Sequence, residues 1–129
     1  MTRYLISFDD GWMTFPREEM PDVAKAVVEV VHEAQDAGVW VLGEGLESQR
    51  ASIVATNGMV TDGPFPETKE VIGGFSVVEV SSREEALEWA AKLAAACRCS
   101  QEVRELLPHP PELEQDVPQA RSAHQPEPA

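Results

Sequence analysis

The spacing of apolar and polar positions predicts two helices set among short strands. A first strand is expected over residues 4–8, and Asp9-Asp10-Gly11 ends it with a turn composition. From Pro21 to about Ala37 the apolar positions recur with helical spacing, Gly38 ends this helix, and a second strand follows over residues 39–42. The core face of this helix is expected to consist of Val23, Val27, Val30, Val31 and Ala34.

The middle of the chain predicts a hairpin followed by an unusually rich loop. Residues 52–56 and 59–61 flank Asn57-Gly58, a pair that tolerates the positive φ angles of a type I′ turn. The next nine residues, 62–70, hold two prolines, a glycine, an aromatic ring, one cation and three carboxylates. A plain turn needs only about two to five residues, so this loop is expected to present side chains for a function.

The last third of the domain repeats the order strand, helix, strand. A strand is expected over residues 75–80, and Ser81 or Ser82 caps a second helix, with Glu84 or Glu85 completing a capping box. A final strand is expected over about residues 101–107. The inner face of the second helix is predicted to consist of Leu87, Ala90, Ala91 and Ala94, with Trp89 at its margin.

This order predicts an α+β fold, a ferredoxin-like β-α-β-β-α-β subunit with an added β-hairpin. Right-handed crossovers place both helices on one face of the sheet and leave the other face bare. A bare face with apolar residues is a patch that monomers seldom tolerate, so we expect a homodimer. Gly73-Gly74 permits close backbone approach where a strand begins and needs no ligand to explain it.

Composition divides the chain into a domain, residues 1–107, and an acidic, proline-rich tail, residues 108–129, which holds six of the ten prolines.

The chain has 129 residues with 23 acidic and 10 basic side chains. Its net charge of −13 would repel nucleic acid. Its apolar runs are too short to cross a membrane, and Asp9 and Asp10 interrupt any signal peptide, so a cytoplasmic protein is expected. Cys97 and Cys99 are expected to be reduced thiols.

Several motifs in one order resemble the DGPF-domain group of the YCII-related family. They are residues 61–65 (Thr-Asp-Gly-Pro-Phe) with 67–70 (Glu-Thr-Lys-Glu), 73–75 (Gly-Gly-Phe), 85–90 (Glu-Ala-Leu-Glu-Trp-Ala) and 43–46 (Gly-Glu-Gly-Leu). The likeness spans about residues 3 to 107. It implies a dimeric α/β barrel of ferredoxin-like subunits. Relatives include muconolactone-type isomerases and dehalogenases, and some DGPF members are encoded beside extracytoplasmic-function sigma factors.

The resemblance also bears on catalysis. YCII-type relatives use a His–Asp pair whose histidine lies on the first helix. The matching position in this chain is Val27. The resemblance therefore implies that this chain lacks the acid/base role of that histidine.

Asp62 is the best candidate for a catalytic carboxylate, because it ends a strand and has a fixed direction. Beside Phe65 and Pro66 it would be partly desolvated and suited to general acid or base catalysis. Alternatively, it accepts hydrogen bonds from the amides of its own turn. Both interpretations stay open.

The other expected ligand-binding residues follow Asp62 in the same loop, and each has a structural alternative. Lys69 with Thr68 would meet an anionic ligand, or would pair with Glu67 or Glu70 at the surface. Phe65 would floor a pocket, or would pack in the core or a dimer. The candidate ligand-binding set is Asp62, Pro64, Phe65, Glu67, Thr68 and Lys69.

The remaining polar groups predict no further site. His32, four residues before Asp36, is expected to form an exposed helical pair rather than a catalytic one. Oxygen ligands for a cation exist at the expected strand ends on Asp9, Asp10, Glu44 and Asp62, but their spacing matches no known calcium or magnesium loop, so no metal is expected. No cofactor motif is visible.

Two functions of different classes follow. The first is a homodimeric small-molecule binding domain, with the extension that it is an acid/base enzyme acting on a small organic acid or lactone. The second is a non-catalytic regulatory interaction module, for example one linked to an extracytoplasmic-function sigma factor. The sequence names neither the ligand nor the reaction.

Overall fold

The computed structural model describes residues 1–47, 51–63 and 71–110. Within them the chain forms six strands, two α-helices and two short 3-10 turns at Asp10–Trp12 and Arg17–Glu19. The strands and helices, in chain order, are β1 Thr2–Asp9, α1 Met20–Asp36, β2 Trp40–Gly45, β3 Ser52–Val54, β4 Val60–Asp62, β5 Ile72–Val80, α2 Arg83–Cys97 and β6 Glu102–Glu105.

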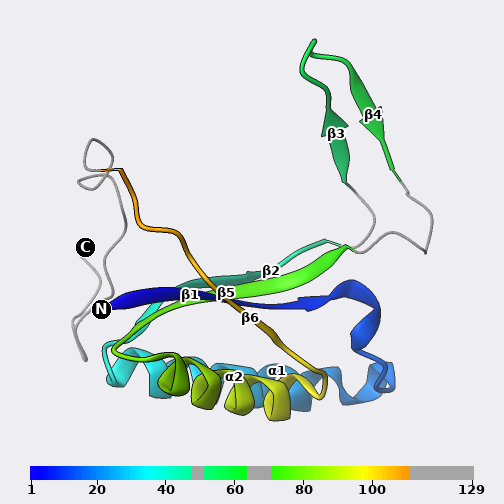
Figure 1. The fold of residues 1–129 in the computed structure, drawn as a ribbon. Coiled ribbons are helices and arrows are strands. Elements are labelled where there is room, and N and C mark those ends of the chain that lie inside the picture. The colour runs from blue at the N-terminus through cyan, green and yellow to red at the C-terminus, as the bar shows by residue number, and fades with distance from the viewer. Residues whose placement is uncertain (48–50, 64–70, 111–129) are drawn as a thin grey trace, which may run out of the picture.

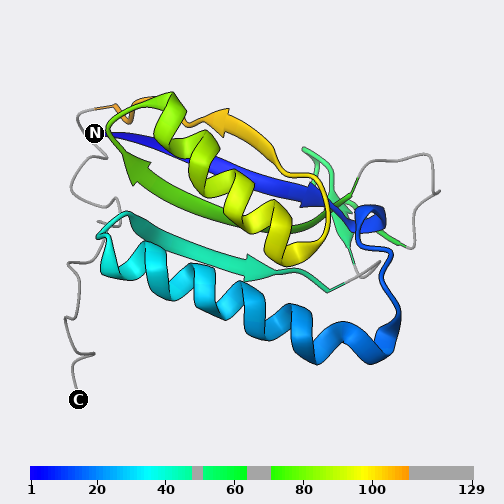
Figure 2. The ribbon, with the colours of Figure 1, turned by 90° about the horizontal axis from the view of Figure 1, so that it is seen from below.

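Four of the strands make one antiparallel sheet in the order β2-β5-β1-β6. Both helices lie side by side on one face of this sheet, and no described helix covers the other face (Figures 1 and 2). The predicted ferredoxin-like α+β fold is therefore confirmed. The added hairpin is confirmed as well: β3 and β4 form a separate two-stranded sheet that stands away from the rest (Figure 1).

The helix ends follow from local chemistry. Gly38, at φ 74°, takes the left-handed conformation that ends α1. At the start of α2, the Ser82 hydroxyl accepts a hydrogen bond from the Glu85 amide at 3.2 Å. The Glu85 carboxylate in turn accepts from the amide and the hydroxyl of Ser81, at 3.0 and 3.1 Å. Ser82 is thus the cap, as one of the two predicted alternatives, and Glu85 is its partner.

The core lies between the helices and the sheet. Its buried side chains are Tyr4, Ile6, Ala34, Val39, Val78, Val80, Ala86, Ala90 and Leu93. The predicted face of α2 was partly wrong: Ala90 is buried, but Leu87 is 44% exposed and Ala91 is exposed. The alanines of α2 occur on all of its sides, so the apolar pattern does not mark one buried face. Leu93 rather than Leu87 packs in the core.

The hairpin turn also differs from the prediction. A type I′ turn needs positive φ at both central residues, but only Gly58 has one, at 88°, and Asn57 does not. The Gly58 amide donates to the Ala55 carbonyl at 2.9 Å, and the Ala55 amide donates to the Met59 carbonyl at 2.8 Å. The connection is therefore a three-residue loop closed by a glycine bulge. The Asn57 side chain accepts from the Met59 amide at 3.0 Å, which explains an asparagine without positive φ.

The face of the sheet away from the helices is partly apolar. Leu5 and Val77 face each other there in register, with Leu42 beside Val77, and Leu42 is 36% exposed. On the same face Arg3 forms an ion pair with Glu79 at 3.5 Å. Neither helix of the described chain has the length and apolar character needed to cross a bilayer.

Candidate functional site

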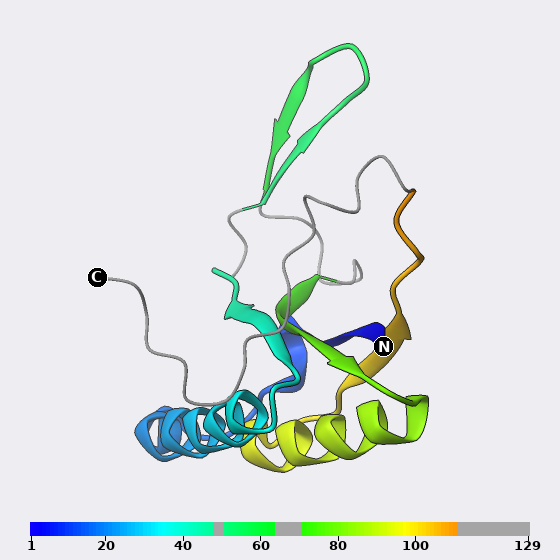
Figure 3. The same cartoon turned by 90° about the vertical axis from the view of Figure 1, so that its left-hand side faces the viewer.

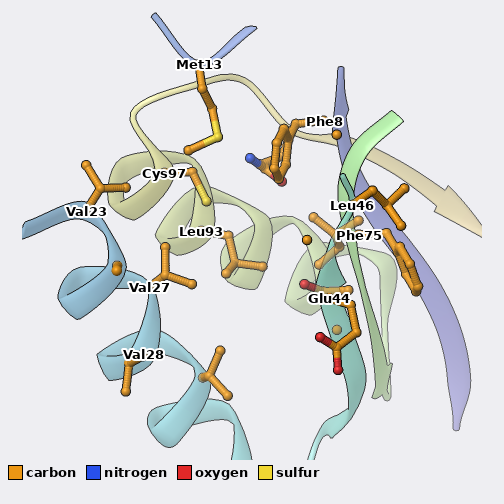
Figure 4. A pocket seen from close by; sticks show the side chains of 18 of the residues that line it. Phe8, Met13, Val23, Val27, Val28, Glu44, Leu46, Phe75, Leu93 and Cys97 are labelled. Atoms are coloured by element: carbon orange, nitrogen blue, oxygen red, sulfur yellow. The ribbon is translucent and has the colours of Figure 1, made fainter. Parts of the chain in front are cut away.

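A cavity of about 510 Å³ lies between α1 and the sheet (Figure 4). Its volume falls within the roughly 300–1,000 Å³ typical of small-molecule sites. The described residues that line it come from α1, α2, the sheet and the segment after β1. The cavity is therefore the first place to look for a ligand.

The helices supply apolar walls. On α1, Val23, Val27 and Val28 line the cavity, and on α2, Leu93 and Cys97 do so (Figure 4). Val23 and Val27 belong to the core face predicted for α1, but Val27 is only half-buried because the cavity lies in front of it. A position that the family resemblance assigns to a catalytic histidine thus carries an apolar side chain at the cavity wall.

Three glycines of β2 and β5 let cavity-lining groups lie close against the sheet. A Cβ at Gly43 would lie 2.5 Å from the Trp40 ring, and one at Gly74 would lie 2.7 Å from the Phe8 ring. At Gly73 it would lie 2.8 Å from the Cα of Asp10. Glycine at these positions lets both aromatic rings and the chain after β1 lie close against the sheet. The predicted role of Gly73-Gly74 in close backbone approach is confirmed.

The polar groups of the cavity are few. Asp10, Glu44, Ser76 and Gln101 are among the lining residues, and no lysine, arginine or histidine is among those that the structure describes. The backbone fixes Asp10 in place, since its amide donates to the Val71 carbonyl at 2.7 Å. Asp9 supports the same junction, because its carboxylate accepts from the Val71 amide at 3.2 Å. The described lining therefore suits neutral or cationic groups better than anions.

Cys97 is the nucleophilic side chain nearest to this cavity, but it is not activated. Burial raises the pKa of its thiol from 9.0 to about 11, and the neighbouring Cys99 adds to the shift. Burial also raises the pKa of Cys99. Both cysteines are free, as predicted. At neutral pH Cys97 is a thiol, so its contribution to the cavity is packing rather than nucleophilic attack.

Asp62 lies elsewhere, at the exposed end of β4. It faces Ser52 across the hairpin, and its carboxylate accepts a hydrogen bond from the Ser52 hydroxyl. It is not among the residues that line the cavity. The other predicted ligand-binding residues, Pro64, Phe65, Glu67, Thr68 and Lys69, lie outside the described residues. Their role stays a prediction.

His32 is exposed on α1 and does not line the cavity, so the prediction of a surface histidine is confirmed. The oxygen ligands considered for a cation come from three parts of the fold. Asp9 ends β1 and Asp10 follows it, Glu44 lies in β2, and Asp62 ends β4. Among residues 1–47, 51–63 and 71–110, no three histidine, cysteine or acidic side chains gather in a group that would hold a metal ion.

Sequence reasoning missed the cavity, although two signals pointed to it. Val27 stands where the family resemblance places a functional residue, and a functional position marks a site even when its side chain has changed. The glycines Gly43, Gly73 and Gly74 were the second signal, because they cluster in strands that face aromatic side chains. Glycine within a strand often marks a close approach of this kind.

Fold and site together define a ferredoxin-like α+β domain with an apolar cavity under its first helix. The chain matches the YCII-related domain over residues 4–109, and it belongs to that family. No curated protein matches it.

Proposed function

We propose that the chain is a homodimeric small-molecule binding domain whose ligand occupies the cavity between α1 and the sheet. The observation that carries this proposal is a cavity of about 510 Å³ with valine walls, lined also by Trp40, Phe8 and Asp10, which glycines let lie close against the sheet. An apolar cavity with a few polar groups is the usual form of a ligand site.

The described lining favours a mainly apolar, uncharged ligand with one polar end, and a lactone fits this description. A small organic acid fits less well, because no cation lines the described part of the cavity. Lys69, in the loop predicted to bind an anion, is the cation that the sequence offers for a carboxylate. The two ligand classes are therefore distinguishable by experiment.

Binding without catalysis has specific support in this chain. The family resemblance assigns the histidine of YCII-type relatives to the position of Val27, and Cys97 is a neutral thiol. If the protein does catalyse a proton transfer on a lactone, the carboxylates that the cavity offers are those of Asp10 and Glu44. The alternative function, a regulatory module for an extracytoplasmic-function sigma factor, is compatible with a cavity that senses a ligand. Residues 61–65 favour the DGPF group, in which such gene neighbours occur.

The cavity is tested with a neutral fluorescent probe, N-phenyl-1-naphthylamine. Val27→Trp fills the space in front of α1 and is expected to weaken probe binding at least about tenfold, a loss of roughly 1.4 kcal/mol. His32→Ala, on the exposed side of the same helix, is the matched control and is expected to bind as the wild type does. Circular dichroism establishes that both variants are folded. Unchanged binding by folded Val27→Trp would contradict the proposal.

Two further arms locate and classify the ligand. Asp62→Asn is expected to leave probe binding unchanged; loss of binding in this variant alone would place the ligand on the predicted loop instead. δ-Decalactone is expected to displace the probe, whereas its hydrolysed hydroxy acid is not. Displacement by the acid alone would favour the organic-acid ligand predicted for Lys69.

Homodimerisation is proposed from the partly apolar sheet face that no described helix covers. Light scattering coupled to size exclusion tests it directly. A monomeric mass at micromolar concentrations would contradict this part of the proposal.

A further inference from the structure

The β3–β4 hairpin is apolar, and within residues 1–47, 51–63 and 71–110 it has little support from other elements of its subunit. Ile53, Val54, Met59 and Val60 are 43%, 65%, 68% and 58% exposed. Among the described elements, β3 and β4 pack chiefly against each other. A two-stranded hairpin on its own is marginally stable in water, and apolar side chains that stay exposed add nothing to its stability. Because these side chains stay exposed, a covering surface from outside the subunit would stabilise the hairpin.

The position of the hairpin indicates where that surface lies. The hairpin rises on the side of the sheet away from the helices (Figures 1 and 3). On that side the sheet presents Leu5, Leu42 and Val77. A body that covers this open face would stand next to the hairpin, so one partner can cover both apolar surfaces.

Charge indicates what the partner is. The chain has a net charge of −13, yet Asp62 is the sole ionisable side chain within residues 51–63. Two acidic copies repel each other over most of their surface, and an uncharged hairpin is where they can meet without that cost. A basic partner protein would instead be drawn to the acidic surface elsewhere. The neutral hairpin therefore favours a second copy of this chain.

We infer that the β3–β4 hairpin is a dimerisation arm, and that Val54 and Val60 of each copy pack on the partner beside its open sheet face. This inference rests on the homodimer of the proposed function and adds the element that stabilises it. Val54 and Val60 face each other in register, so the two side chains form one apolar pair on the arm. Two-fold symmetry doubles the effect of any change there, because each dimer contains two arms.

The test is the dimer dissociation constant, measured by analytical ultracentrifugation of the full chain. In the double variant Val54→Thr/Val60→Thr both residues stay β-branched, so strand preference and shape are retained while apolar contact is lost. We expect the dissociation constant to rise at least about tenfold. Thr56→Ser, in the exposed turn of the same hairpin, is the matched control and is expected to dimerise as the wild type does.

A second variant guards against a hairpin that no longer folds. Met59→Lys lies outside both strands, where the side chain is 68% exposed, and is also expected to raise the dissociation constant at least about tenfold. If Val54→Thr/Val60→Thr and Met59→Lys both dimerise with the wild-type dissociation constant, the proposal of a dimerisation arm is overturned. Val77→Lys on the open face separates the two proposals: if it alone gives monomers, the homodimer stands and the arm is wrong. If the wild type is itself monomeric, both proposals fail.

Discussion

The Trp40 ring lies so close to Gly43 that a Cβ on residue 43 would stand 2.5 Å from it. Real Cβ atoms essentially never approach other atoms so closely. Trp40 also packs against the buried core and lines the cavity, so its ring can move mainly into the cavity space. Gly43→Ala is therefore expected to destabilise the fold by about 1–3 kcal/mol and to weaken binding of N-phenyl-1-naphthylamine.

The same strand supplies the control. A Cβ on residue 45 would meet no atom within 4 Å, so Gly45→Ala is expected to leave stability nearly unchanged. Urea unfolding of the two variants, followed by Trp fluorescence, makes the comparison. Equal midpoints for Gly43→Ala and Gly45→Ala would show that the Trp40 ring is not confined as described.

Gly73→Ala is expected to cost more than Gly43→Ala. The added Cβ would meet the Cα of Asp10 at 2.8 Å, and backbone cannot rotate away as a side chain can. The junction between Asp9, Asp10 and Val71 would have to open, with loss of its hydrogen bonds at 2.7 and 3.2 Å. Urea midpoints measure this order, and a smaller loss for Gly73→Ala would contradict it.

Cys97 gives a prediction in pH. Its pKa is raised from 9.0 to about 11, so the folded state keeps the proton that the unfolded state loses. The resulting stabilisation is fully present below about pH 9 and is lost as the pH rises toward about 11. Thermal melting between these limits is expected to fall more steeply in the wild type than in Cys97→Ala. Parallel curves would contradict the assignment.

The cap of α2 predicts a smaller change. Ser82→Ala removes the hydroxyl that accepts from the Glu85 amide and is expected to cost about 1 kcal/mol of unfolding free energy. Ser100→Ala, at an exposed position beyond the other end of α2, is expected to have no measurable effect. An equal effect of both substitutions on urea unfolding would argue against the cap.

The sequence was sufficient for the fold because its local signals agree with the tertiary arrangement. Gly38 ends α1 as expected, Ser82 starts α2, and the order of strands and helices allows a ferredoxin-like sheet. Local signals were ambiguous where several backbones suit the same residues. Asn57-Gly58 fits both a type I′ turn and a three-residue loop with a glycine bulge, and the alanines of α2 leave its buried face undetermined.

The site was harder to predict because a cavity is made by what is missing between elements. Val27 has the same spacing whether the space before it is filled or empty. Polar residues in a loop are readily interpreted as a binding site, and Asp62 is interpreted in this way from the sequence alone. Its described contact is with Ser52 across the hairpin. The glycines beside Trp40, Phe8 and Asp10 are a sequence signal near the cavity. Their role can be interpreted only when the groups packed against them are known, and these come from the structure.

Native mass spectrometry of the wild type and Val27→Trp, each incubated with N-phenyl-1-naphthylamine, tests the cavity most directly. It counts bound probe per chain and reports the oligomeric state in the same spectrum. We predict one probe per chain on the wild type and none on folded Val27→Trp. Equal probe occupancy on both proteins would contradict a ligand site between α1 and the sheet.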